Sequence, residues 1–192
     1  MSKTDPDATF MRMKEDHMLN GQLKPGYNLQ AATNNQFIAN YTLAQTTADT
    51  TTLIEHTEDF ISGYGKPPET LTADAGYGSD ENYSYLEDND IEAFVKYSYF
   101  HREQLDDKRG NTKNPFAADK LFYNEGTDTY YCPMGQPMQN IGNYIRKTAT
   151  GYEQKIDRYQ AENCAGCQLR SLCHQSKGNR IVERNHRQAR LR

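Results

Sequence analysis

Apolar and polar residues alternate in two short stretches, residues 26–32 and residues 37–43, with the period of a half-buried β-strand. Asn34 and Asn35 lie between these stretches, and asparagine tolerates the positive φ angles that a tight turn requires. The pattern therefore predicts a β-hairpin near the start of the chain.

A helical period follows the predicted hairpin. Asp49 or Thr50 is expected to cap the N-terminus of this helix, and Gly63 and Gly65 are expected to end it. The side chains that fall on one face of the helix are Leu53, Ile54, Thr57, Phe60 and Ile61.

Residues 71–79 predict a short apolar strand that ends at Asp74 and runs into a glycine-rich turn. Pro67 and Pro68 exclude a helix before this strand, and Ser79 can cap a helix after it. Asp74 is therefore expected at the carboxyl end of a strand, where open α/β sheets place their ligands. The alternative is an aspartate that only caps the turn.

The helix expected after Ser79 carries Tyr83 and Leu86, and alternation returns over residues 91–97 as a further strand. The expected order is strand, strand, helix, strand, helix, strand. Helices placed between strands favour a mixed sheet, so the fold class predicted for residues 26–99 is α/β with flanking helices.

The other segments have weaker patterns. Residues 1–25 show no sustained period and are expected to form an arm, with at most a short helix over residues 11–18. Residues 100–118 are charged and are expected to be a linker, and residues 119–176 are expected to be a small β-rich insertion. The strand-like pieces of that insertion are residues 120–123, 129–132, 143–147 and 152–158.

The amino-acid composition limits the classes of protein to which this chain can belong. Hydrophobic residues make up 35% of the chain and the mean hydropathy is -0.98, so a thin core is expected. No apolar run approaches the length of a membrane span, and the N-terminus lacks the apolar block of a signal peptide. We therefore expect a cytoplasmic protein without a membrane partner.

The net charge is -4, but it is unevenly distributed. Residues 177–192 form a basic tail with six basic residues and one acidic residue, whereas the rest of the chain is acidic. Such a tail is expected to contact nucleic acid through Arg184, Arg187 and Arg190, or else to be a solvated terminus.

The chain contains four cysteines, Cys132, Cys164, Cys167 and Cys173. A close pair from one turn, joined by ligands from elsewhere, is how a structural tetrahedral zinc site is assembled. His174 could replace Cys173. Free thiols and an iron-sulfur cluster are the alternatives, and a disulfide is not expected in the cytosol. A closed four-ligand site would stabilise the fold and would not catalyse.

Several motifs together resemble the DDE transposases of bacterial insertion sequences. The motifs occur in this order: Thr-Asp-Pro-Asp-Ala at residues 4–8, Lys-Pro-Gly-Tyr-Asn-Leu-Gln at residues 24–30, Ala-Asp-Ala-Gly-Tyr-Gly-Ser at residues 73–79 with Glu81, Asn82 and Tyr83, and the late cysteine cluster. They extend over almost the whole chain, which makes the resemblance more specific than any single motif.

The resemblance implies a ribonuclease-H-like domain that holds two Mg²⁺ or Mn²⁺ ions between two aspartates and a glutamate. Asp74 corresponds to the second aspartate. The first aspartate and the glutamate are expected outside this chain, so we interpret the chain as the central part of a transposase that is inactive alone. Asp5 and Asp7 are poor substitutes for the first aspartate because Pro6 argues against a core strand, and Glu183 is expected in a strand or turn.

The resemblance also implies double-stranded DNA, both transposon ends and target, as the partner. Lys24 and Tyr77 flank the motifs and are candidate DNA contacts. A sheet without its first strand would have an unpaired edge, so a homo-oligomer is expected. Two alternatives stay open: a zinc-stabilised DNA-binding module without catalysis, and a metal-dependent nuclease.

Overall fold

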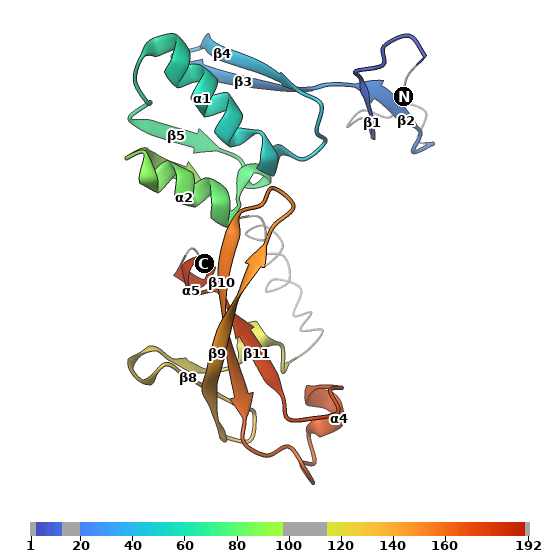
Figure 1. Cartoon of the computed structure of the whole chain (residues 1–192), viewed down its shortest axis with the longest axis vertical. Coiled ribbons are helices and arrows are strands. Elements are labelled where there is room, and N and C mark those ends of the chain that lie inside the picture. The colour runs from blue at the N-terminus through green and yellow to red at the C-terminus, as the bar shows by residue number, and fades with distance from the viewer. Residues whose placement is uncertain (1–2, 13–19, 98–114, 191–192) are drawn as a thin grey trace. The chain divides into compact units, whose positions relative to one another are not determined.

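The structure is a computed structural model that describes residues 3–12, 20–97 and 115–190. It divides into two compact units, Met1–Phe100 and His101–Arg192, which are considered separately. Figure 1 shows several small sheets and few helices. The predicted mixture of helices and strands is therefore confirmed.

The N-terminal arm contains two strands, β1 (Thr9–Arg12) and β2 (Leu23–Gly26), which pair antiparallel. The expectation of an arm without strands was wrong. Phe10 and Leu23 both stay exposed, so the pair has no buried face that would give the sequence a period of two. Most of the short helix expected over residues 11–18 lies outside the described residues, but its first two residues belong to β1.

The predicted hairpin is confirmed as β3 (Asn28–Asn34) and β4 (Phe37–Ala44), with positive φ angles at Asn35 and Gln36. The burial of its two faces is the reverse of what the alternation predicts, since apolar side chains are exposed and a polar one is buried. Leu29 and Leu43 are paired with each other and are each 60% exposed, whereas Gln30 is only 3% exposed. The apolar face of this hairpin is thus uncovered in the described structure.

The first long helix is α1 (Leu53–Tyr64), which follows a 3₁₀ helix, η1 (Asp49–Thr51), and ends as predicted at Gly65 with a φ of 72°. Figure 1 shows α1 beside the β3–β4 hairpin. The predicted cap was wrong, because the N-cap is Thr52 and no side chain makes a capping hydrogen bond there. The carboxylate of Asp49 instead accepts a hydrogen bond from the β3 side chain of Asn28.

The predicted strand and helix around Asp74 are confirmed. They are β5 (Thr70–Ala73), a short 3₁₀ helix η2 (Ala75–Tyr77) and α2 (Asp80–Asp88). The hydroxyl of Ser79 accepts a hydrogen bond from the backbone N–H of Asn82 at 3.1 Å, which satisfies one of the open donors at the start of α2. The following strand, β6 (Glu92–Val95), pairs parallel with β5.

The single mixed sheet expected for the first unit is not formed by the described residues. The antiparallel pair β3–β4 and the parallel pair β5–β6 are separate two-stranded sheets. No described strand bridges the two pairs, so they are connected through α1, α2 and the core of Leu53, Leu86 and Ile91.

The second unit is β-rich, as expected. Its five antiparallel strands lie in the order β11-β10-β9-β8-β7. Their bounds are β7 (Tyr123–Asn124), β8 (Thr129–Tyr131), β9 (Pro137–Lys147), β10 (Glu153–Ala161) and β11 (Ile181–Arg184). The short helices are η3 (Ala118–Lys120), η4 (Glu125–Thr127), α4 (Arg170–Cys173) and α5 (His186–Arg190).

Two details of this unit differ from the sequence expectation. The first expected strand begins later, since Ala118–Lys120 is a 3₁₀ helix. The basic tail is not a separate appendage, because β11 pairs with β10 and buries Val182 in the core with Met138 and Tyr159. Residues 100–114 of the predicted linker lie outside the described residues.

Candidate functional site

Asp74 lies at the carboxyl end of β5, as predicted, and its side chain is exposed. It caps η2, because Oδ1 accepts a 2.7 Å hydrogen bond from the backbone N–H of Gly76. That bond orients the carboxylate. Among the described residues, no group of three or more histidine, cysteine or acidic residues is arranged to hold a metal ion, so Asp74 is not part of such a group.

A second carboxylate borders the same turn. A Cβ atom built on Gly76 would lie 2.8 Å from Oδ1 of Asp74 and 3.2 Å from Oδ2 of Asp49. These two oxygens are therefore at most about 6 Å apart. Sequence reasoning interpreted Asp49 only as a helix cap, since nothing along the chain indicates that the loop before α1 meets the loop after β5.

A chain of side-chain hydrogen bonds holds Asp49. Asn28 donates to Oδ1 of Asp49 at 2.8 Å, Gln30 donates to Asn28 at 2.8 Å, and the hydroxyl of Tyr77 donates to Gln30. Burial raises the pKa of Tyr77, and the negative charges of Asp49 and Asp74 raise it further. Tyr77 therefore keeps its proton at neutral pH, and its hydroxyl is used inside the protein.

The other candidates near the motifs lie in the N-terminal segment, before β3. Lys24 is exposed on β2. The hydroxyl of Tyr27 donates a 2.9 Å hydrogen bond to Asp5, whose other carboxylate oxygen accepts from the backbone N–H of Asp7. Asp5 is thus engaged in local contacts.

The cysteines meet in the second unit. All four line one pocket of about 270 Å³, together with His174 and Arg180 among others. All four are free thiols. The structure thus brings together a set that the sequence spreads from Cys132 to Cys173, although no three of them lie close enough to hold an ion as placed.

Hydrogen-bond donors surround these sulfur atoms. The backbone N–H of Gln136 lies 3.3 Å from Sγ of Cys132, and the backbone N–H of Arg180 lies 3.4 Å from Sγ of Cys164. The guanidinium of Arg180 lies 2.7 Å from Sγ of Cys173. Three of the four sulfur atoms thus lie within hydrogen-bond distance of N–H groups.

His174 lies beside the cysteines with one ring nitrogen free. Its Nδ1 makes a 2.6 Å hydrogen bond with Ser176, whereas its Nε2 is buried and has no hydrogen-bond partner. Burial lowers the pKa of His174, and the charges of Arg170 and Arg180 lower it further. The neutral imidazole is therefore favoured.

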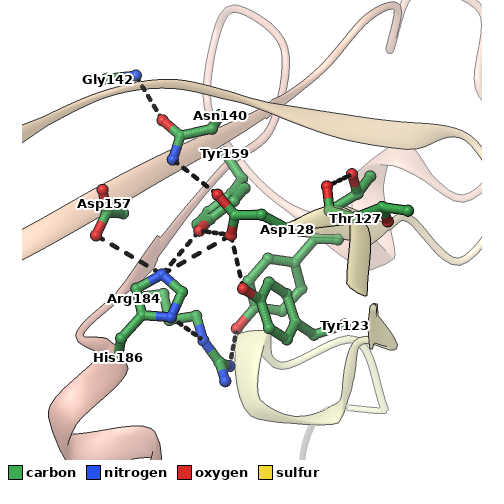
Figure 2. A network of polar contacts seen from close by, with 11 residues as sticks. Tyr123, Thr127, Asp128, Asn140, Gly142, Asp157, Tyr159, Arg184 and His186 are labelled. Atoms are coloured by element: carbon green, nitrogen blue, oxygen red, sulfur yellow. Dashed lines mark hydrogen bonds and ion pairs between the residues drawn. The ribbon is translucent and has the colours of Figure 1, made fainter. Parts of the chain in front are cut away.

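The second unit also contains a polar network around Asp128 (Figure 2). Asp128 accepts hydrogen bonds from Tyr123 at 2.6 Å, from Tyr159 and from Asn140 at 3.4 Å. The Nε2 atom of His186 lies 2.9 Å from the Tyr159 hydroxyl. Sequence reasoning missed this network, because its members come from the end of η4, from separate strands and from α5.

The network includes one predicted DNA contact. The guanidinium of Arg184 lies 3.8 Å from the ring centre of Tyr123, and its Nη1 donates to the hydroxyl of Tyr130 at 2.9 Å. Arg187 and Arg190 lie on α5, directly after β11. Glu183 lies in β11, as expected, and accepts a 3.1 Å hydrogen bond from Tyr144.

The described residues thus define a mixed α/β protein with two neighbouring carboxylates at a strand end and a cysteine-lined pocket. Residues 131–192 match the family model of the transposase DDE domain. This match supports the resemblance to the DDE transposases. The matched segment includes all four cysteines but not Asp74. No curated protein and no solved structure matches the chain.

No helix in the described ranges is both long enough and apolar enough to cross a membrane.

Proposed function

We propose that this chain is part of a DDE transposase that cleaves and joins double-stranded DNA with Mg²⁺ or Mn²⁺, and that Asp74 is one of its metal ligands. The observation that carries the proposal is the placement of Asp74, exposed at the carboxyl end of β5 and oriented by the N–H of Gly76. Ligands of open α/β sheets bind at this end of the strands.

The order of elements supports a ribonuclease-H-like domain. An antiparallel hairpin, a helix, a strand, a helix and a parallel strand follow each other from β3 to β6. This is the order that the resemblance implies after its first strand. We propose that β3–β4 and β5–β6 belong to one sheet of the complete enzyme.

The residues at Asp74 suit a hard divalent cation. Carboxylate oxygens are the ligands that Mg²⁺ and Mn²⁺ prefer, and the missing Cβ of Gly76 leaves the oxygens of Asp74 and Asp49 facing one space. When bound, such ions activate a water or 3'-hydroxyl and stabilise the leaving oxygen. The contribution of this chain is to hold a carboxylate in a fixed orientation, and the N–H of Gly76 does so.

We propose that the chain alone does not cleave DNA. The described residues give Asp74 no set of three metal ligands, and Asp5 and Glu183 make hydrogen bonds with tyrosines. Two-metal cleavage needs more carboxylates than one or two.

Lys24, Arg187 and Arg190 are proposed DNA contacts because they are exposed or terminal basic residues. Tyr77 and Arg184 are proposed contacts because they would flank the bound strand. Arg184 and Tyr77 also serve the fold through their hydrogen bonds. Assembly as a homo-oligomer and location in the cytoplasm are part of the same proposal.

The cysteine pocket supports a second proposal, a structural zinc ion held by Cys132, Cys164, Cys167 and Cys173. The donor set suits zinc, and His174, whose Nε2 is buried without a hydrogen-bond partner, is a replacement ligand. The sulfurs would have to move toward each other, because no three of these residues are arranged for an ion. The same pocket favours the alternative of a zinc-stabilised DNA-binding module without catalysis.

Incubation of the chain with supercoiled DNA and Mn²⁺, combined with band-shift measurements, tests the function. We expect DNA binding without nicking, and weaker binding when Arg187 and Arg190 are both changed to alanine. Nicking that disappears in Asp74→Asn would identify a complete nuclease and contradict the proposed inactivity. A chain that binds no DNA would contradict the transposase role.

A further inference from the structure

We propose that one face of the β3–β4 hairpin is a self-association surface, on which a second copy of this chain packs the same face. The inference rests on the homo-oligomer of the proposed function and names the surface that joins two copies. It is independent of the metal site at Asp74.

The surface is formed by three cross-strand pairs at alternate positions of β3. The pairs are Leu29–Leu43, Ala31–Tyr41 and Thr33–Ile38. Alternate residues of a strand point to the same side of a sheet, so the six side chains share one face. All six residues are exposed, and four of them are large and apolar or aromatic.

The opposite face of the hairpin is covered within the chain. Gln30 is 3% exposed and Ala44 is 8% exposed. The hydroxyl of Thr42 lies 2.8 Å from Nδ1 of His56, and the side chain of Asn40 donates to the carbonyl oxygen of His56 at 3.2 Å, so α1 packs on this side (Figure 1). The hairpin therefore offers one open face, and two copies that pair through it form a closed dimer.

The distribution of charge favours a second copy as the occupant. Charged residues make up 25% of the chain, but residues 25–48 contain no acidic residue, lysine, arginine or histidine. In a two-fold symmetric pair the same patch meets itself, so a charge on it would face a like charge. An uncharged patch avoids this repulsion. DNA, in contrast, needs basic side chains opposite its phosphates, and this face has none.

The exposed area is sufficient for a weak dimer. The large side chains of the surface are exposed by 60% at Leu29, 71% at Ile38, 67% at Tyr41 and 60% at Leu43. At roughly 200 Å² for a large side chain, they offer about 500 Å² per chain. A symmetric pair would bury about 1,000 Å² in total, which is the low end for a specific protein–protein interface.

Sedimentation velocity of the whole 192-residue chain over a range of concentrations tests the inference without any assay of activity. The variants are Leu29→Lys and Leu43→Lys, each of which places like charges opposite each other in the dimer. The control is Leu23→Lys on β2, where the same change is made at a side chain that is 55% exposed. Circular dichroism checks that each variant keeps the fold.

We expect the wild-type chain to dimerise with a dissociation constant of roughly 10 to 100 μM. Leu29→Lys and Leu43→Lys should each raise this constant about tenfold or more, and Leu23→Lys should leave it unchanged. Since the surface is uncharged, the constant should rise by less than about twofold between 0.1 and 1 M NaCl. Dissociation of the dimer by 1 M NaCl would assign the contact to charged residues elsewhere and overturn the inference.

The other outcomes separate this surface from the rest of the proposed function. Wild-type affinity in both hairpin variants, or an equal loss of affinity in Leu23→Lys, would overturn the surface and leave the homo-oligomer standing. A wild-type chain that stays monomeric at about 1 mM would overturn both. Neither result bears on DNA binding and cleavage, which the band-shift and nicking measurements test.

A second measurement needs no variant and covers the case in which Leu29→Lys or Leu43→Lys does not fold. The methyl signals of Leu29, Leu43 and Leu23 are followed by NMR in the wild-type chain as its concentration is raised. We expect the signals of Leu29 and Leu43 to shift with one common midpoint while Leu23 stays constant. Constant signals of Leu29 and Leu43 in a chain that dimerises would overturn the inference.

Discussion

The side-chain amide of Asn28 on β3 donates a 2.8 Å hydrogen bond to the carboxylate of Asp49 in η1. This contact ties the start of the hairpin to the loop before α1, and it places Asp49 beside the turn that follows Asp74.

Asn28→Ala should destabilise the first unit by roughly 1 to 2 kcal/mol, because it removes the donor to Asp49 and leaves the buried amide of Gln30 without its acceptor. Urea unfolding, followed by the amide signals of α1, measures the change. Asn34→Ala at the exposed end of β3 is the control and should have little effect. Equal stability of both variants would show that the Asn28 contact does not hold the loop.

Gly76→Ala should weaken Mn²⁺ binding while the fold is retained. The added Cβ would lie 2.8 Å from Oδ1 of Asp74 and 3.2 Å from Oδ2 of Asp49, so these side chains have to move apart. Mn²⁺ titration of the variant checks this expectation.

Gly63→Ala is the matched control for that change. A Cβ on Gly63 meets nothing within 4 Å, and alanine favours the helical conformation of α1 by about 0.5 to 1 kcal/mol. We expect unchanged Mn²⁺ binding and slightly higher stability. A loss of binding in both variants would point to an effect of helix or loop dynamics and not to the space at Gly76.

The first unit should lose stability as the pH falls below about 6.5. Burial lowers the pKa of His56, which Asp59 only partly offsets, so the folded state resists a proton that the unfolded chain accepts. His56 is not an ordinary surface residue, since its Nδ1 lies 2.8 Å from the hydroxyl of Thr42 and its Nε2 is buried without a hydrogen-bond partner.

His56→Gln tests this assignment by removing the titrating group while keeping a polar side chain toward Thr42. The free energy of opening of α1, obtained from the protection of its amides against exchange, should differ between about pH 7 and about pH 5 in the wild type. In the variant the two values should agree more closely. An undiminished pH dependence in His56→Gln would assign the effect to another group.

The second unit should lose stability in a lower pH range. Burial raises the pKa of Asp128, but hydrogen bonds from Tyr123, Tyr159 and Asn140 outweigh this effect, so that the pKa lies below its usual value. The stabilisation is present above about pH 4 and is lost as the pH falls through the lowered pKa.

Asp128→Asn should remove this acid dependence and cost roughly 1 kcal/mol at neutral pH, a modest value because the side chain is half-exposed. Asparagine suits the position because it also tolerates the φ of 46°. Unfolding of the second unit across this pH range is the measurement. Asp119→Asn, an exposed change of equal charge, should behave like the wild type.

The proposed zinc site predicts about one zinc per chain after purification without added metal, and background zinc after Cys164→Ser and Cys167→Ser are combined. Chelation should unfold the second unit and spare the first, because the cores around Tyr159 and Leu86 are separate. Ser171→Ala on α4 is the control. Equal zinc in the wild type and the cysteine variant would rule the site out.

Local sequence determined much of the first unit. The alternation in the hairpin, Ser79 before α2 and Gly65 after α1 each act through neighbouring residues, so their effects are readable along the chain. The same holds for Asp74, whose position after a short apolar strand and before a glycine-rich turn is a local feature.

Contacts between distant residues were decided only by the tertiary structure. The approach of Asp49 to Asp74, the network around Asp128 and the pairing of β1 with β2 depend on how separate segments meet, and no short pattern encodes this. The four cysteines show the same division. Their spacing predicts that they act together, but the pocket that they share exists because β8, β10 and α4 fold toward one another.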